Sequence, residues 1–369
     1  MALSVADKEI ALIKKILGLR ENVDYSDPEN RATLRYGRLV IMTDADSDGS
    51  HIKGLIINLF DELYPSLIQE GFICDYRTKY LRAARGKAKA IDFYTPDEFE
   101  VWKKKTPEWE KYKFSYYKGL GTSEKKDIKE DSKNPLFIDL SYDKRAADTI
   151  NVAFGKANAD DRKNWLEEWR ETKRRPFIIR GMEIMSLTTF FNREFILYVL
   201  DSLERAIPRF ADGLKRSQGQ ILWGVMNRWP SLSGEKRKVA QLAGDIAGYV
   251  DYKHNEMCLA EAIKAMARHF TGSNNMPLLE PKGQFGERMF GGVDAASARY
   301  IYTKPDPITK HIFNLKDNKI LDFFEDSGAH SDPKYFLPII PYALLNGIQG
   351  VATAYSTNVM NYNPIEIMM

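Results

Sequence analysis

One short stretch constrains this chain more than any other: an apolar run that ends in alternating aspartates and continues into a helical pattern. Residues 38–43 have an apolar, β-branched centre, which is typical of a strand buried on both faces. Asp44, Asp46 and Asp48 follow at once, and apolar residues at helical spacing then run from about residue 50 to 69. Strand, acidic loop and helix form the βα unit of an open α/β sheet. Such sheets bind ligands at the carboxyl ends of their strands, which is where these aspartates fall.

The three aspartates predict a site for a hard divalent cation. Carboxylates at i and i+2 of an extended loop point the same way, and they repel one another unless a cation neutralises them. Oxygen ligands favour Mg²⁺ or Ca²⁺ over zinc. The run resembles the start of an EF-hand loop, but Leu55 stands where that loop needs a glutamate and a strand precedes it, so we exclude an EF-hand. The alternative is a solvated acidic turn that caps the following helix.

Composition and charge set broad limits. A chain of 369 residues has room for two or three domains, and 44% hydrophobic and 28% charged residues are ordinary for a globular protein. The net charge of +3 does not itself indicate a nucleic-acid partner, because an acidic site and basic grooves cancel in the sum.

Cys74 and Cys258 form no Cys-x-x-Cys pair, so we expect neither a zinc site nor a disulfide framework. No apolar run is long enough to span a bilayer. A helix over residues 7–19 suggests that the chain begins inside a larger protein.

Two different patterns follow along the chain. Up to about residue 145 the α/β pattern continues, with strands over 91–94 and 114–117 and a helix that Thr95 caps. A strongly charged helical connector comes next. Four helices and a glycine-rich stretch then suggest a winged-helix DNA-binding domain. These helices are predicted over 194–206, 214–227, 236–249 and 256–270.

Tyr300 is a candidate nucleophile. A protonated tyrosine hydroxyl is weak and needs a nearby cation or proton acceptor. Arg299 is permanently charged and can stabilise a phosphoryl group under attack. The small residues at 291–298 leave the backbone open to a bulky phosphate. The alternative is that Tyr300 is one of 19 tyrosines and simply packs.

These stretches resemble one known family. Residues 34–55 look like the second acidic motif of the TOPRIM domain in eukaryotic-type (type IIA) DNA topoisomerase II, and residues 117–122 are similar to its next landmark. Residues 291–301 resemble the Arg-Tyr motif of its winged-helix domain. Further matches occur in the same order along nearly the whole chain, at residues 207–215, 239–243, 254–256, 270–275, 283–286, 335–340 and 346–347.

The resemblance implies an α/β plus α+β fold: a Rossmann-like TOPRIM domain with a parallel sheet, a winged-helix domain and an incomplete tower base. Its domains would be residues 1–145, a charged helical connector at 146–195, the winged helix at 196–320, and the base of the tower at 321–369.

The same resemblance implies a mechanism. Tyr300 would attack a DNA phosphate and form a 5′-phosphotyrosyl link, with Arg299 and His254 supporting the phosphate and the proton transfer. Asp44 and Asp46 would bind Mg²⁺, with Asp48 beside them. Double-stranded DNA and a second copy of the protein are the implied partners, and ATP would act only through a domain absent from this chain. The residues expected to contact DNA are Lys118, Gly119, Gly121, Thr122, Lys215, Gln284, Arg288 and Val359.

The chain departs from the family pattern at four places. No Glu-Gly-Asp-Ser motif precedes Asp44, so we expect an N-terminally truncated TOPRIM domain and an incomplete metal site. Residues 218–220 (Gln-Gly-Gln) lack the usual basic pair, and Val293 replaces a lysine. Val359 replaces the isoleucine that wedges between bases.

We interpret these changes as marks of a divergent member, such as one from a large DNA virus. The location would be the nucleus for a cellular protein, or the replication site in the host cytoplasm for such a virus.

Two other functions stay open at this point. A TOPRIM-type nuclease or primase would use water and need no tyrosine. A DNA-binding scaffold would keep the fold without cleaving DNA.

Overall fold

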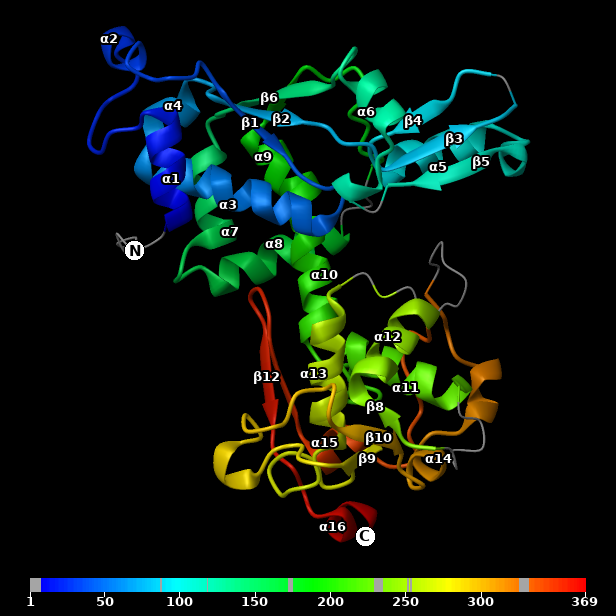
Figure 1. The fold of residues 1–369 in the computed structure, drawn as a ribbon. Helices are drawn as coiled ribbons and strands as arrows, with labels where there is room; N and C mark the ends of the chain where they lie inside the picture. Colours follow the sequence, from blue (N-terminus) through cyan, green and yellow to red (C-terminus); the bar gives the residue numbers. More distant parts are fainter. Residues whose placement is uncertain are drawn as a thin grey trace. The chain divides into compact units, whose positions relative to one another are not determined.

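The computed structural model describes residues 8–86, 88–117, 119–171, 175–228, 235–250, 252, 254–324 and 332–369. Lys118, one of the predicted DNA contacts, lies outside the described residues. The chain divides into two compact units, Met1–Asp201 (unit 1) and Ser202–Met369 (unit 2) (Figure 1).

Unit 1 is built on a four-stranded mixed sheet. Its order is β1-β2-β6-β7. The strands are β1 (Leu39–Met42), β2 (Ile73–Tyr76), β6 (Phe137–Ser141) and β7 (Ile184–Ser186). β1 and β2 are parallel, as are β6 and β7, but β2 and β6 are antiparallel. The prediction of a parallel sheet was therefore wrong for the central pair. The chain between these two strands forms a separate antiparallel sheet in place of a single crossover helix, and β6 returns in the opposite direction.

The helical connection from β1 to β2 begins earlier than predicted. α3 (Ser47–Leu63) starts at Ser47 because Asp46 caps it, with Asp46 Oδ1 accepting from Gly49 N at 2.7 Å. α3 ends before Pro65, which opens the short helix α4 (Pro65–Gln69). Phe60 of α3 is buried, with its ring 6.0 Å from that of Phe72 just before β2. α1 (Lys8–Leu17) and α2 (Pro28–Arg31) precede β1.

A small antiparallel sheet of order β4-β3-β5 lies between β2 and β6 in sequence. It contains β3 (Leu81–Ala84), β4 (Ile91–Phe93) and β5 (Lys113–Tyr116) and packs on α5 (Pro96–Lys105). Two short 3-10 turns, η1 (Trp109–Lys111) and η2 (Leu120–Thr122), and α6 (Lys125–Asp131) complete this region.

The predicted cap of α5 by Thr95 is confirmed. Thr95 Oγ1 accepts from Glu98 N at 3.2 Å. The buried Glu98 carboxylate does not return to Thr95 N: it accepts from Tyr94 N at 3.0 Å, Ile179 N at 3.0 Å and Arg180 N at 2.8 Å. Glu98 therefore joins α5 to a segment about 80 residues further along the chain.

Residues 146–195, predicted as a charged helical connector, lie within unit 1. They contain α7 (Ala146–Phe154), α8 (Ala159–Glu171), β7, α9 (Leu187–Phe190) and a π-helical turn, η3 (Phe191–Phe195). β7 pairs with β6, and α7 contacts α3, α8 and α9. α10 (Ile196–Ala206) then leads out of unit 1.

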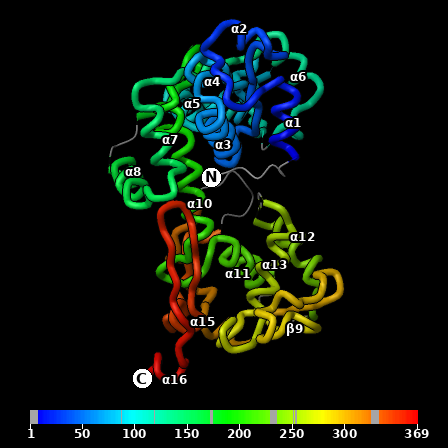
Figure 2. The backbone as a smooth tube through the Cα atoms, turned by 90° about the vertical axis from the view of Figure 1, so that its left-hand side faces the viewer, coloured from blue at the N-terminus to red at the C-terminus, as the bar shows by residue number. Residues whose placement is uncertain are grey.

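Unit 2 contains three helices that pack on one another (Figure 2) and a three-stranded antiparallel sheet. The helices are α11 (Arg216–Arg228), α12 (Val239–Tyr249) and α13 (Glu256–Ala267), and the sheet order is β8-β10-β9. Its strands are β8 (Arg237–Lys238), β9 (Leu279–Lys282) and β10 (Tyr302–Pro305). This arrangement agrees with the predicted winged helix. The predicted helix at 236 begins at Val239, because Arg237 and Lys238 pair with β10.

The segment predicted as a tower base shares the core of unit 2. Phe336, Tyr342 and Leu345 are buried in the same hydrophobic cluster as Phe313 and Ile301. The remaining elements of unit 2 are η4 (Arg288–Phe290), α14 (Thr309–Ile312), η5 (Leu315–Lys319), α15 (Tyr342–Asn346), the hairpin β11 (Ile348–Val351) and β12 (Ser356–Val359), and α16 (Pro364–Met368). Among the described residues, no helix has the length and apolar character needed to cross a membrane.

Two helical glycines give a matched test of this packing. A Cβ at Gly54 would lie 2.5 Å from the ring of Phe195, which is buried, whereas nothing lies within 4 Å of a Cβ at Gly244 in α12. We expect Gly54→Ala to lower the free energy of unfolding by about 1–3 kcal/mol through overpacking. Gly244→Ala should raise it by up to about 1 kcal/mol. Denaturant unfolding of both variants measures this, and an unchanged stability for Gly54→Ala would contradict the packing of α3 on η3.

Candidate active site

The predicted acidic loop and glycine turn meet in unit 1. Asp44 follows the end of β1 after one residue, Thr43, and its Oδ1 accepts from Leu120 N at 2.7 Å. A Cβ at Gly119 would lie 3.2 Å from Asp44 Oδ2, so the glycine allows the turn to approach the carboxylate. Thr78 Oγ1 donates to Thr43 O at 2.8 Å and holds the end of β1 beside the end of β2. The acidic loop and the glycine turn, about 75 residues apart in sequence, are thus joined by a direct hydrogen bond.

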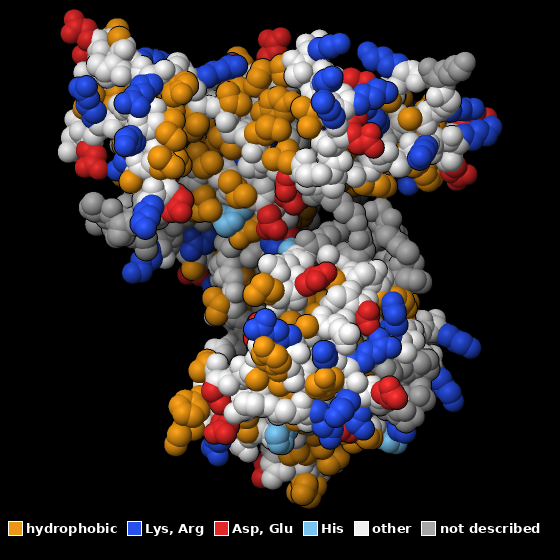
Figure 3. Space-filling model, viewed as in Figure 1, with side chains coloured by type: hydrophobic (Ala, Val, Ile, Leu, Met, Phe, Trp, Pro, Cys, Tyr) orange, Lys and Arg blue, Asp and Glu red, His pale blue; other side chains and the backbone are white. Residues whose placement is uncertain are grey.

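A cavity of about 280 Å³ lies beside this feature. Its lining includes Asp44 and Gly119 together with the apolar side chains of Met42 and Leu120. Figure 3 shows hydrophobic side chains gathered over β1 and α3 of unit 1, where Met42 and Ile52 are about half exposed.

Asp46 and Asp48 have different surroundings from those predicted. Asp46 is the cap of α3, and Asp48 lies in the first helical turn, so the three carboxylates do not alternate along an extended loop. Partial burial raises the pKa of Asp46 above its ordinary value, with smaller contributions from Asp48, Asp44 and Asp201, although the hydrogen bond from Gly49 N lowers it. Because Asp46 is exposed in part, solvent screens these effects.

Asp201, which no sequence motif indicated, also belongs to this acidic group. Asp201 Oδ2 accepts from Ser47 Oγ at 2.9 Å, at the start of α3. Asp201 lies in α10, more than 150 residues away, and no local pattern connects it with the loop. In the described part of the chain, no three histidine, cysteine, aspartate or glutamate side chains gather as a complete metal site would require.

A buried charge network lies under α3. Lys53 Nζ is 2.9 Å from Asp75 Oδ1, and Arg77 Nη2 is 2.9 Å from Asp75 Oδ2. Arg77 Nη1 also donates to Glu194 Oε2 at 2.8 Å. Burial favours a raised pKa for Glu194, but the charges of Arg77 and Lys53 outweigh it and hold this pKa below its ordinary value. The network joins α3, β2 and η3, the elements that support the acidic loop.

Tyr300 is exposed on unit 2. The residue is 66% exposed, and the guanidinium carbon of Arg299 lies 4.9 Å from the centre of its ring. The backbone around it is held firmly: Ala240 N donates to Ala298 O at 3.1 Å, and Val239 N to Ile301 O at 3.0 Å. The start of α12 and the buried Ile301 side chain therefore fix a tyrosine whose own side chain faces solvent.

The loop before Tyr300 is held by residues of its own and by Arg268, which no sequence motif indicated. Arg268 Nη2 donates to Gly292 O at 2.8 Å, and its Nε to Phe285 O at 3.2 Å. A Cβ at Gly292 would lie 2.4 Å from Arg268 Nε, which explains the glycine. Gln284, predicted to bind DNA, uses its side chain within the loop: Oε1 accepts from Gly286 N at 2.7 Å and Nε2 donates to Asp294 at 3.2 Å.

The other predicted contacts of unit 2 are dispersed. His254 is exposed before α13 and its ring lies edge-on to Tyr252 at 5.4 Å. The described contacts do not join it to Tyr300. Arg288 is exposed in η4, Lys215 is partly exposed before α11, and Val359 is half-buried where it pairs with Ile348 at the open end of the hairpin.

Packing against Arg209 explains why a glycine stands at position 219, where the family pattern has a basic residue. A Cβ at Gly219 would lie 2.9 Å from Arg209 Nη1, so the guanidinium of Arg209 occupies the space beside α11. Gln218 Oε1 accepts from Lys215 N at 2.8 Å, and Gln220 Nε2 donates to Asp332 at 3.3 Å.

Comparison with known proteins agrees with both units. The family model for the C-terminal associated domain of TOPRIM matches residues 76–203, and the model for the gyrase-type A subunit of DNA gyrase/topoisomerase IV matches residues 205–369. The boundary between the two matches falls at the division between units 1 and 2. These matches define the class: a TOPRIM-associated unit followed by a unit of the DNA gyrase/topoisomerase IV type.

Relatives along the whole chain specify the class further. The chain is 40% identical over 375 residues to human DNA topoisomerase 2-alpha and to Arabidopsis thaliana DNA topoisomerase 2, covering 98% of this chain in each case. A crystal structure of the Plasmodium falciparum topoisomerase II DNA-binding, cleavage and re-ligation domain has a TM-score of 0.81 and 40% identity, covering 98% of this chain and 49% of that one. Along nearly its whole length the chain is therefore similar to DNA topoisomerase II proteins. It spans about a quarter of the length of the curated relatives it matches.

The residues at the acidic loop fit a hard cation in donor chemistry. Asp44, Asp46, Asp48 and Asp201 supply only oxygen atoms, and the mutual repulsion that contributes to the raised pKa of Asp46 is what a divalent cation would relieve. Asp44 uses Oδ1 for Leu120 N, which leaves Oδ2 for another partner.

The Arg268 contacts predict a loop whose order depends on one side chain. Arg268→Met keeps the aliphatic stem but removes the donors to Phe285 O and Gly292 O. We expect amide hydrogen exchange in residues 284–292 to rise about tenfold, since a hydrogen bond from a charged group contributes roughly 1.5–3 kcal/mol. Arg288→Met, in the same loop but exposed, is the control and should leave exchange unchanged. Equal exchange in the two variants would show that Arg268 does not hold the loop.

Proposed function

We propose that this chain is the DNA cleavage and religation core of a type II topoisomerase, with Tyr300 as the nucleophile. The observation that carries the proposal is an exposed tyrosine on a rigid backbone with a guanidinium against its ring. It stands in a chain that resembles topoisomerase II along nearly its whole length.

Tyr300 Oη would attack the phosphorus of a DNA phosphodiester. A bond from Oη to phosphorus forms, the bond from phosphorus to the 3′ oxygen breaks, and the tyrosine proton leaves to an acceptor, for which His254 is the candidate. Arg299 would stabilise the negative charge on the phosphoryl oxygens. The ester stores the energy of the broken bond, so religation by the 3′ hydroxyl needs no other energy source.

Asp44 and Asp46 are the residues that would hold Mg²⁺, with Asp48 and Asp201 nearby, and the ion would supply positive charge for the leaving 3′ oxygen. Gly119, Gly121 and Thr122 lie in the turn bonded to Asp44, and would approach the DNA backbone there.

The partners follow from the same proposal. In the family the tyrosine of one protomer works with the acidic loop of the other, so we infer a symmetric dimer on double-stranded DNA. ATP would enter through a domain outside this chain, and the nucleus is the proposed location, with a viral replication site as the alternative.

Substitution of Tyr300 tests the nucleophile. The protein in its full natural length is incubated with supercoiled plasmid and Mg²⁺, then quenched with detergent. We expect protein attached to 5′ DNA ends, and complete loss of the adduct in Tyr300→Phe, because no other hydroxyl occupies that position. Tyr302→Phe, two residues away in β10, should keep the adduct.

The other outcomes identify the competing functions. Hydrolysed ends without attached protein would establish a TOPRIM-type nuclease. Retarded DNA without cleavage would establish a binding scaffold.

The salt dependence of binding tests the DNA contacts. Each phosphate contact contributes about 0.9 to the slope of log K against log salt concentration. We expect Arg288→Gln to reduce the slope by about that amount, and Lys215→Gln to do the same. The control is Lys14→Gln. Lys14 lies in α1, and its ammonium pairs with Glu21 at 2.8 Å. A flat salt response in the unsubstituted protein would count against a phosphate-binding surface.

A further inference from the structure

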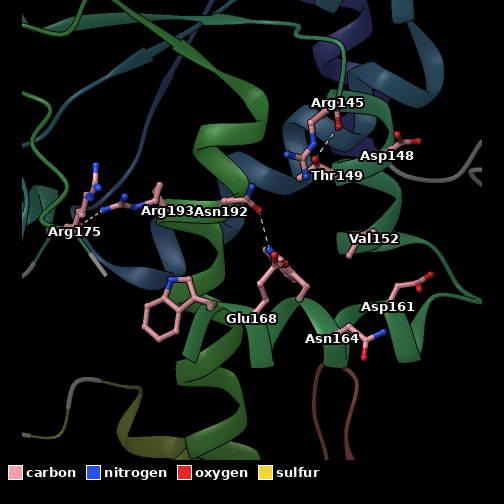
Figure 4. Close-up of a pocket in the computed structure, with 12 residues that line it drawn as sticks. Arg145, Asp148, Thr149, Val152, Asp161, Asn164, Glu168, Arg175, Asn192 and Arg193 are labelled. Carbon is pink, nitrogen blue, oxygen red and sulfur yellow. Dashed lines mark hydrogen bonds between the residues drawn. The ribbon is translucent and has the colours of Figure 1, made fainter. Parts of the chain in front are cut away.

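A cavity of about 730 Å³ lies between α7, α8 and η3 in unit 1 (Figure 4). Its lining shares no residue with the smaller cavity beside Asp44. Pockets of about 300–1,000 Å³ hold small ligands. The proposed cleavage chemistry gives this cavity no role.

One face of α8 supplies two tryptophans to the cavity. Trp165 and Trp169 are one helical turn apart and so lie on the same side of the helix, together with Asp161. The indole N–H of Trp165 donates to Asn192 Oδ1 at 2.8 Å, which fixes the ring and leaves the Asn192 Nδ2 group as a donor. The aromatic wall is therefore formed before any ligand arrives.

α8 itself is held in place from behind. Arg162 Nη1 donates to Val152 O at 3.1 Å and Gly155 O at 2.7 Å, and Leu166 is fully buried. These contacts fix the separation of α7 and α8 and keep the cavity open.

The charged groups of the lining balance in number. They are Arg145, Arg175 and Arg193 against Asp148, Asp161 and Glu168. Arg193 donates to the carbonyl of Arg175, and its guanidinium carbon lies 5.0 Å from the ring of Phe177. In Figure 4 the Arg145 side chain extends from α7 toward the gap that Asn192 faces, whereas Arg175 and Arg193 lie on the other side of Asn192.

We propose that this cavity binds a nucleotide with a single phosphate. The base would stack on the tryptophans, and Asn192 and Asn164 would bond its edge. Asp148 or Asp161 would accept the sugar hydroxyls, as acidic residues do in nucleotide sites. Arg145 would bind the phosphate. The inference does not depend on the cleavage proposal.

The balance of charges selects this ligand class. A purely cationic ligand would stack on the tryptophans and pair with the carboxylates, but the positive charge of Arg145 would repel it. A polyphosphate would bring several negative charges near three carboxylates. A nucleotide with one phosphate uses the aromatic, amide, acidic and basic groups together. It has two possible sources, a free nucleoside monophosphate or an unpaired nucleotide of a DNA strand.

Calorimetric titration of the chain with adenosine monophosphate, adenosine and a short oligodeoxyadenylate tests the proposal. Saturable binding of the monophosphate, weakened at least tenfold in Trp169→Leu, is expected because stacking contributes substantially for each base. Arg145→Gln should reduce monophosphate affinity to that of adenosine and leave adenosine binding unchanged, which a purely structural role for Arg145 would not do. Glu167→Gln, on α8 but outside the lining, is the control.

The source of the nucleotide follows from the third ligand. Binding of the oligonucleotide alone, with the same dependence on Trp169 and Arg145, would identify a DNA strand as the source. Absence of saturable binding by all three ligands would overturn the proposal. Binding that neither variant weakens would overturn it as well.

Discussion

The buried network of Lys53, Asp75, Arg77 and Glu194 is the constraint on which the acidic loop depends. All four side chains are nearly inaccessible to solvent, and each carries a charge that would be costly if left without its partner. The network therefore permits one placement of α3 relative to β2 and η3. Asp46 caps α3 and Asp44 lies two residues before this cap, so that placement also sets where the carboxylates lie.

Each unit prepares its own half of the proposed chemistry before DNA is present. In unit 1, Asp44 is bonded to the turn at Leu120, so the loop and the turn form one feature. In unit 2, Arg268 and Gln284 hold the loop before Tyr300, and the start of α12 fixes the backbone beside it. Catalysis by positioned charges benefits from such preparation, because little reorganisation then remains for the reaction.

Local features of this chain were predictable from sequence. The strand at β1, the helix after the aspartates, the Thr95 cap and α11 to α13 follow from hydrophobic periodicity and capping residues. The start of α3 was missed by three residues because its first turn after the Asp46 cap is polar and carries no apolar periodicity. The antiparallel pairing of β2 and β6, and the attachment of residues 146–195 to the main sheet, arise from tertiary contacts that carry no local signal. The roles of Asp201 and Arg268 also carry no local signal, because each makes its hydrogen bond to a residue distant in sequence, Ser47 and Gly292 respectively.

Mass spectrometry of the protein–DNA product tests the central claim most directly. The product is digested with nuclease and protease, and the residue that keeps a nucleotide is located by fragmentation. A single modified peptide is expected, with the nucleotide joined through its 5′ phosphate to Tyr300. A nucleotide on any other residue, or an adduct joined through a 3′ phosphate, would contradict it.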